Sequence, residues 1–337
     1  MRARRKLLVT MAAGAGSLAG LAICGRIAAT GPGGLAVVRR NARALGANVR
    51  IVAAHRSRDT VERAVAAALD ELRRIEGIVS LYRPGSEIRR LNVRGVLERP
   101  DSDLVALLHY ARQLSAATAG AFDVTVQPLW ELYAGAYAEG RLPGSEAIDA
   151  TLARVDHRKL DVGRWRVRLG SGIGITLNGI AQGFATDRVL GVLRQHGIES
   201  ALVDTVELGT VGNKEGGAPW TVGIQDPRRP EALVSIATLD GRSLATSGDY
   251  ATTFSADFSS HHIFDPATGR SPQAFRSVSV VASSGLDADA LSTAAFVLGL
   301  PKGLRLIDQW PGADALFVLK DGSVQATAGF PGSLLRG

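Results

Sequence analysis

Asp289 and Thr293, near the C-terminal end of the sequence, could together bind a metal ion. They lie four residues apart in DADALSTAAFVLG, whose apolar positions predict an amphipathic helix. Residues four apart share one face of a helix, so this carboxylate and this hydroxyl can converge on one ion. Oxygen ligands of this kind suit a hard divalent cation such as magnesium. In the structural alternative, the carboxylate stabilises the helix dipole and the threonine bonds to its own backbone.

Two adjacent histidines, His261 and His262, precede the turn sequence DPATG. Neighbours in an extended segment point to opposite sides, so we expect only one of them to face a cleft. A single histidine positioned by Asp265 could accept a proton or bind phosphate. The spacing is not that of an HExxH zinc site. A structural histidine beside a turn is the alternative interpretation.

The segment GITLNGIAQG, residues 174–183, precedes a predicted helix. Asn178 is a suitable N-cap, and Gly179 and Gly183 have no side chains that would hold a ligand away. The N-terminus of a helix attracts phosphate because its first N–H groups are unpaired. The spacing matches neither a Walker loop nor a dinucleotide fingerprint. A phosphate site and a tightly packed strand-to-helix turn therefore explain this segment equally well.

Two loops in the first half of the chain carry aromatic residues next to polar ones. Tyr82 lies just before a Pro-Gly turn in SLYRPGSEIRRLN, where a side chain can project into a cleft. Phe122 and Asp123 follow the glycine that ends a predicted helix, in GAFDVTVQPLWELY. An aromatic ring beside a carboxylate suits a planar heterocycle. Either loop alone is also typical of an ordinary solvated turn.

Strands and helices alternate among the elements that must position these residues. The β-branched NVRIVA predicts a strand over residues 48–53, and apolar residues at helical spacing predict helices over 59–78 and 103–117. Several short strands with turn signals follow in the second half. We therefore predict an α+β fold: one two-lobed unit with mixed sheets and flanking helices.

The composition is that of a globular protein, with 46% hydrophobic and 21% charged residues among 337. The net charge of +7 comes from the N-terminus: residues 1–50 hold nine of the 39 Lys and Arg and no acid, which leaves 30 basic and 32 acidic residues in 51–337. A domain without positive excess is not suited to nucleic acid. The single cysteine, Cys24, excludes a disulfide within the chain.

The N-terminus resembles an export signal, because basic residues precede the uncharged run 7–25. The adjacent Arg4 and Arg5 are typical of twin-arginine signals. A membrane anchor is the alternative, and Cys24 suggests a lipidation site, although cleavage near Ala28 is equally consistent. We expect a periplasmic mature protein. The predicted division is a signal segment over 1–30, a linker over 31–44 that begins with GPGG, and a functional domain over 45–337.

These motifs together resemble the ApbE family, the FAD:protein FMN transferases. The segments SLYRPGSEIRRLN, GAFDVTVQPL, LNGIAQGFATDRV, ATSGDY, HHIFDPATG and DADALSTAAFVLG occur in the order and spacing of that family, from about Leu45 to the C-terminus. The resemblance implies an ApbE-like, T-fold-related domain. It also implies a magnesium-dependent enzyme that moves FMN from FAD to a threonine of an acceptor protein and releases AMP. The TLNGIAQG variant and the exported leader are most similar to the NosX branch, which serves a membrane protein of nitrous-oxide reduction, so the expected acceptor is membrane-bound.

The resemblance also implies roles for individual residues. Asp289 and Thr293 look like the magnesium ligands, completed by the backbone carbonyl of Gly179. His262, not His261, matches the family histidine near the FAD phosphates, and with Asp289 it is the expected catalytic residue. The positions that match flavin or FAD contacts are Leu45, Tyr82, Ala121, Phe122, Asp123, Thr176 and Gln182.

Three departures from the family pattern keep other functions open. Thr176 and Gln182 stand where the family commonly has an aspartate and a lysine, and Val206 stands where a glycine is usual. A β-branched residue there is strained if the turn needs a positive φ, which leaves the roles of Asp204 and Glu207 open. A non-catalytic periplasmic protein that binds and delivers FAD is one alternative. Hydrolysis of FAD to FMN and AMP at the same site is another.

Overall fold

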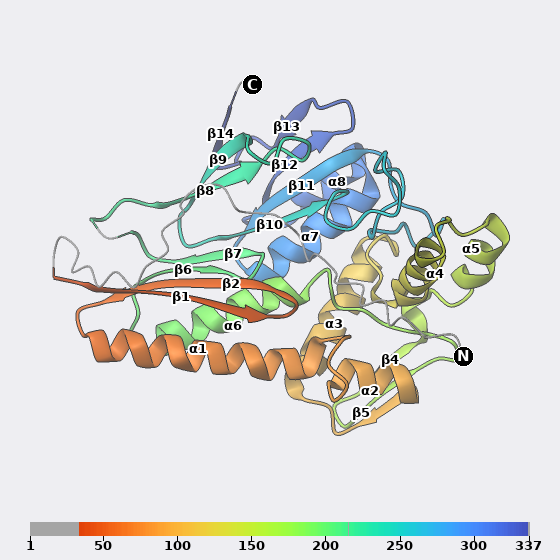
Figure 1. Cartoon of the computed structure of the whole chain (residues 1–337), viewed down its shortest axis with the longest axis horizontal. Helices are drawn as coiled ribbons and strands as arrows, with labels where there is room; N and C mark the ends of the chain where they lie inside the picture. Colours follow the sequence, from red (N-terminus) through yellow and green to blue (C-terminus); the bar gives the residue numbers. More distant parts are fainter. Residues whose placement is uncertain (1–33, 215, 336–337) are drawn as a thin grey trace, which may run out of the picture.

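A computed structural model describes residues 34–335 except residue 215, and in that part three β-sheets combine with eight α-helices and two short 3₁₀ helices (Figure 1). The predicted α+β class is confirmed. The expected mixed sheets are not found, because the chain runs through neighbouring strands in opposite directions. Every ladder between the described strands is antiparallel.

The main sheet has eight strands in the order β1-β2-β6-β7-β10-β11-β12-β13. Its first two strands form a long ribbon at one end, and β10 to β13 form the other end (Figure 1). The strands are β1 (Ala36–Ala44), β2 (Ala47–His55), β6 (Ser200–Asp204), β7 (Leu208–Val211), β10 (Ser243–Gly248), β11 (Phe275–Ala282), β12 (Asp314–Leu319) and β13 (Val324–Ala326).

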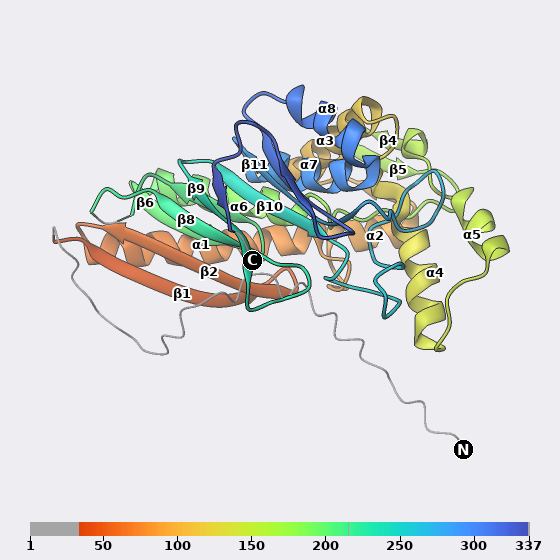
Figure 2. The ribbon, with the colours of Figure 1, turned by 90° about the horizontal axis from the view of Figure 1, so that it is seen from above.

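Four helices pack along the main sheet. The long α1 lies beside the β1–β2 ribbon, α6 packs between α1 and α7, and α7 contacts β10 and β11 (Figures 1 and 2). The buried side chains of α1 recur at helical spacing, and Ser57 caps the helix by accepting a hydrogen bond from the backbone of Thr60. The helices are α1 (Arg58–Val79), α6 (Ala181–Gln195), α7 (Gly285–Leu298) and α8 (Leu300–Asp308).

A three-stranded sheet, β14-β9-β8, covers the opposite face of β11 and β12. The neighbours Val280 and Val281 show this, because they belong to different apolar cores. Successive residues of a strand point to opposite faces, so β11 is buried on both sides, and residues 277–282 are all buried, including Ser277 and Ser279. The strands are β8 (Trp220–Gln225), β9 (Leu233–Leu239) and β14 (Gly332–Leu334).

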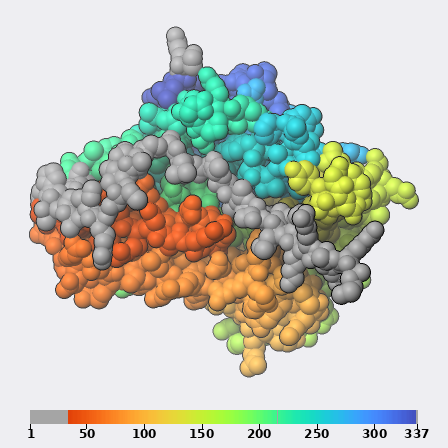
Figure 3. All heavy atoms as spheres, in the orientation of Figure 1, coloured from red at the N-terminus to blue at the C-terminus, as the bar shows by residue number. Residues whose placement is uncertain are grey.

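The remaining elements form a mainly helical group between α1 and β6 in the sequence. Part of this group, α4 and α5, projects at the right-hand edge of the molecule in Figures 1 and 3. The elements are α2 (Glu87–Arg94), β3 (Val96–Glu98), α3 (Ser102–Ala117), η1 (Val124–Val126), α4 (Gln127–Ala138), α5 (Ser145–Leu152), η2 (His157–Lys159), β4 (Leu160–Val162) and β5 (Arg166–Leu169).

The predicted linker over 31–44 is wrong for its larger part, because residues 36–44 form β1. This strand pairs with β2 along its whole length, from Ala36 opposite His55 to Ala44 opposite Ala47. The predicted signal segment lies outside the described residues. Within the described part of the chain, no helix is both long enough and apolar enough to cross a bilayer.

Candidate functional site

One cavity of about 660 Å3 brings together every residue to which the family resemblance assigned a role. It opens among α1, β7, β8, β10, α7 and the loops of the helical group. Residues from both halves of the chain line it: Leu45, Tyr82, Ala121, Phe122, Asp123, Thr176, Gly179, Gln182, His262, Asp289 and Thr293.

One part of the cavity is formed where the N-terminal turns of α6 and α7 meet. Asp289 is 4% exposed, and its Oδ2 accepts a hydrogen bond of 3.0 Å from the backbone N–H of Gly183. The Thr293 hydroxyl lies 3.0 Å from the hydroxyl of Ser247 on β10. A Cβ atom built on Gly179 would lie 3.2 Å from that threonine oxygen, so the TLNG turn packs directly on α7. The three residues predicted to hold magnesium are therefore neighbours.

Two carboxyl groups, those of Asp289 and Glu207, are buried in this part of the cavity. Burial raises the pKa of Asp289 to about 7. The pKa of Glu207 is raised well above its usual value, first by burial and then by the charge of Asp289. Glu207 also accepts a hydrogen bond of 3.2 Å from the backbone of Thr246. Its place beside Asp289 was left open by the sequence, because it depends on how β7 and α7 pack.

These residues fit a bound magnesium ion. A divalent cation would stabilise the ionised form of the two buried carboxylates. Within the described residues no three His, Cys, Asp or Glu side chains form a metal cluster. A cation here would therefore be held by Asp289 with neutral oxygens such as the Thr293 hydroxyl, which leaves coordination positions for water and substrate phosphates, as magnesium requires.

The two histidines have different environments, as the alternation predicted. His261 is fully buried, packs edge-on against Phe296, and has both ring nitrogens within hydrogen-bonding distance of backbone groups. His262 lines the cavity, and its Nδ1 lies 3.2 Å from the carbonyl oxygen of Thr252. A carbonyl can only accept, so Nδ1 carries the proton and Nε2 keeps a lone pair.

Burial lowers the pKa of His262, so the ring is neutral at physiological pH. The expectation that Asp265 positions it was wrong. Asp265 instead closes the DPATG turn by accepting hydrogen bonds from Ala267 and Thr268. This is the common local role of an aspartate at the start of a turn.

Aromatic residues line another part of the cavity. Phe122 is buried there, whereas Tyr82 is 57% exposed. The carboxylate of Asp123 accepts hydrogen bonds from Thr125 and from the backbone of His157, and its Oδ2 lies 3.1 Å from the His157 ring. Asp123 therefore orders the loop that presents Phe122 to the cavity.

Thr176 and Gln182, the two polar residues that depart from the family pattern, both line the cavity. The backbone N–H of Thr176 donates to the carbonyl of Val124, which ties the TLNG turn to the Phe122 loop. Gln182 has a buried side-chain oxygen for which the described residues supply no hydrogen-bond donor. Such an acceptor at a cavity wall fits a ligand that brings an N–H or O–H group. Asn178 is not the N-cap we expected, because α6 begins three residues later, at Ala181.

Val206 has a positive φ, +87°, in the turn between β6 and β7, so the condition under which we expected strain is met. Replacing it with glycine should raise the free energy of unfolding by about 1 kcal/mol, because a β-branched side chain is strained in this region and glycine is not. Alanine keeps a Cβ atom and should give no such gain. Urea midpoints of the two variants check this, and a V206G variant less stable than V206A would contradict it.

Solved structures contain the same fold. An ApbE protein of Thermotoga maritima matches with a TM-score of 0.79 and 31% identity, over 87% of this chain and 97% of that one. The apo form of the flavinyl transferase ApbE of Pseudomonas stutzeri matches with a TM-score of 0.75 and 31% identity, over 87% and 95%. Fold and cavity thus place the chain among the ApbE-type proteins.

Sequence comparison leads to the same group. The ApbE family matches residues 45–317. A FAD:protein FMN transferase of Treponema pallidum is 34% identical over 298 residues, covering 79% of this chain and 80% of that protein. A FAD:protein FMN transferase of Klebsiella pneumoniae is 31% identical over 261 residues, covering 74% and 80%. The chain belongs to the ApbE family.

Proposed function

We propose that this chain is a FAD:protein FMN transferase. The observation that carries the proposal is the single cavity, which joins aromatic residues such as Phe122 to the buried Asp289–Thr293 pair. Such a cavity offers a hydrophobic wall for a flavin ring and hard oxygen ligands for a pyrophosphate with its cation. The relatives named above carry this activity in their names.

The proposed reaction is a phosphoryl transfer. The hydroxyl oxygen of an acceptor threonine bonds to the FMN-side phosphorus of FAD, and the bond from this phosphorus to the bridging oxygen breaks. AMP leaves with that oxygen and its electron pair. The hydroxyl proton passes to Nε2 of His262, which is neutral and has a free lone pair. Phe122 and Gln182 hold the rest of FAD in place.

Magnesium belongs to this proposal as well. When bound, it would be held by Asp289, Thr293 and the backbone at Gly179, and it would neutralise charge on the phosphate oxygens. The contact between Gly179 and Thr293 and the raised pKa of Asp289 support this assignment.

Intact-mass analysis separates transfer from the delivery alternative. The protein is incubated with FAD, magnesium and the threonine-bearing domain of a covalent FMN flavoprotein. A gain of one FMN on the acceptor supports transfer, whereas bound FAD with an unchanged acceptor supports delivery. A parallel reaction without acceptor tests FAD hydrolysis, which would release AMP and free FMN at the full rate.

His262 should determine how the rate of FMN transfer falls at acidic pH, that is, the acidic limb of the pH–rate profile. Since burial lowers its pKa, the neutral base persists as the pH falls to the ordinary value of about 6.5, and the rate falls only below that. His262→Asn should reduce the rate by about 10²-fold and remove this limb. Initial rates at saturating magnesium across this pH range check both. An unchanged limb in the variant would assign it to another group.

We also propose that the protein works in the periplasm on a membrane-bound acceptor of nitrous-oxide reduction. The twin-arginine pattern at Arg4 and Arg5 and the NosX-like TLNGIAQG segment support this. Fractionation of cells that express the full chain tests the location. Loss of covalent FMN from the membrane fraction of a deletion strain would identify the acceptor.

A further inference from the structure

His262, which lines the cavity, ends a loop that folds back on itself. This loop comprises residues 249–262 and is here called the histidine loop. At its base, the carbonyl of Thr252 accepts from both the backbone N–H and the ring of His262, at 3.0 and 3.2 Å. The flanking Thr253 and His261 form an isolated β-bridge. Tyr250, Ala251 and Thr252 line the cavity with His262. The position of the base therefore determines where the imidazole lies.

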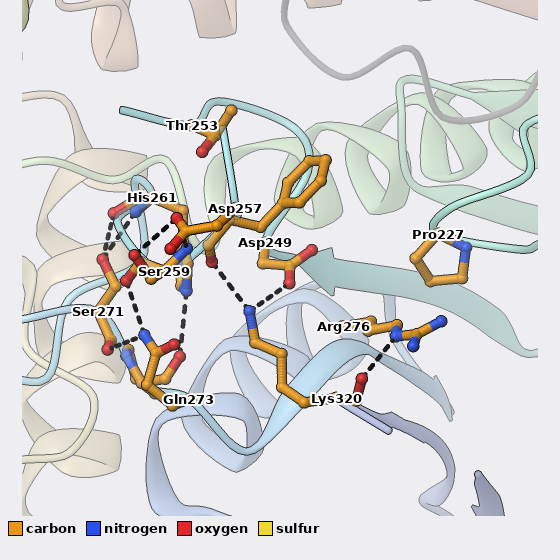
Figure 4. A network of polar contacts seen from close by, with 12 residues as sticks. Pro227, Asp249, Thr253, Asp257, Ser259, His261, Ser271, Gln273, Arg276 and Lys320 are labelled. Atoms are coloured by element: carbon orange, nitrogen blue, oxygen red, sulfur yellow. Dashed lines mark hydrogen bonds and ion pairs between the residues drawn. The ribbon is translucent and has the colours of Figure 1, made fainter. Parts of the chain in front are cut away.

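The histidine loop begins at Asp249, a fully buried carboxylate that receives two cations from other parts of the fold. Arg228, from the connection between β8 and β9, donates both terminal nitrogens to its two oxygens, at 2.8 and 2.7 Å. Lys320, from the turn after β12, donates to Oδ2 at 2.7 Å (Figure 4). One cation would neutralise this carboxylate, so the second needs a separate explanation.

Both cations also contact the tip of the histidine loop. The ammonium of Lys320 donates to the carbonyl oxygen of Phe258 at 2.9 Å. The guanidinium of Arg228 lies 3.9 Å from the centre of the Phe258 ring. Phe258 itself has a left-handed backbone, with φ of +59°, which a phenylalanine adopts only where its surroundings hold it. The two cations thus join the start of the loop to its tip.

We propose that Arg228 and Lys320 are positioning residues for His262. Neither side chain lines the cavity. Together they hold Asp249 and Phe258, and through them the base of the histidine loop, in one arrangement. This inference rests on the proposed transfer reaction. If the loop tip is released, the rate of transfer should therefore fall by a larger factor than the affinity for FAD.

Lys320→Met tests this directly, because methionine keeps the length of the side chain and removes the ammonium. We expect kcat to fall ten- to 100-fold with KM for FAD changed less than threefold, since small displacements of a reacting group have effects of this size. Lys320→Arg should recover most of kcat, because a guanidinium can also donate to both Asp249 and Phe258.

The chain offers a matched control in Arg242→Met. Arg242 is about as exposed as Lys320, 23% against 26% for the side chains, and pairs with Asp240 and Asp314 without touching the histidine loop. If both variants lose the same thermal stability and the same kcat, Lys320 is only a structural residue and the inference is wrong.

Hydrogen exchange gives a readout that does not depend on transfer. Peptides within residues 250–262 should exchange faster in Lys320→Met than in the wild type, with no change in Arg242→Met. A wild-type protein that transfers no FMN would refute the proposed function, while the exchange result would still decide whether Lys320 holds the loop. Unchanged exchange in Lys320→Met would overturn the inference.

Discussion

Replacing Asp289 with asparagine should reduce FMN transfer by at least ~10³-fold while the protein stays folded. The substitution keeps the shape of the side chain and an acceptor for the Gly183 N–H, but removes the negative charge. Loss of a charged ligand that neutralises a phosphoryl-transfer site costs several kcal/mol of transition-state stabilisation, and about 1.4 kcal/mol corresponds to a tenfold rate change. FAD should still bind through Phe122 and the aromatic part of the cavity.

Asp287→Asn is the control for this prediction. Asp287 lies in the first turn of the same helix and bonds to Ser284 and Tyr110 outside the cavity. Its variant should transfer FMN within a few-fold of the wild type. Initial rates of AMP release, with FAD binding followed by flavin fluorescence, compare the two. An Asp289→Asn protein that transfers within tenfold of the wild type would refute the metal assignment.

Gly183→Ala should lower the free energy of unfolding by about 3 kcal/mol, because the backbones of α6 and α7 touch at this position. A Cβ atom here would overlap the carbonyl oxygen of Gly285 and lie 2.7 Å from the Cβ atom of Asp289. Neither neighbour is the end of a flexible side chain, so one helix must move, and overpacking of this kind is strongly destabilising. Transfer should fall as well, because the movement displaces Asp289.

Gly191→Ala, in the same helix, should have the opposite effect. A Cβ atom there meets nothing within 4 Å, so alanine should stabilise the helix by up to about 1 kcal/mol. Chemical denaturation of both variants measures the difference. Equal effects of the two substitutions would show that the contact between α6 and α7 is not the reason for glycine at position 183.

The sequence predicted best the relative positions of residues that lie close together in one helix or strand. Asp289 and Thr293 share a helix face because of the helical period, and His261 and His262 diverge because of the extended backbone. From the sequence, the positive φ of Val206 was only a condition for strain, and the turn between β6 and β7 meets this condition.

Relations that depend on packing between distant segments were missed. The strand β1 was interpreted as part of a linker because the breaker sequence GPGG directly precedes it, and only its pairing with β2 shows its place in the sheet. Glu207 meets Asp289 only because α7 lies against the main sheet. The Arg228–Asp249–Lys320 contacts join three separate segments, and the spacing of these residues in the sequence gave no signal.

We propose that the cavity transfers FMN from FAD to a protein hydroxyl. The most direct measurement follows the intact mass of a threonine-bearing acceptor and the AMP released in the same reaction, with FAD and magnesium present. We expect one AMP for each FMN joined to the acceptor, and no modified acceptor when Asp289→Asn replaces the wild type. FAD bound to the wild-type protein with an unmodified acceptor would contradict it.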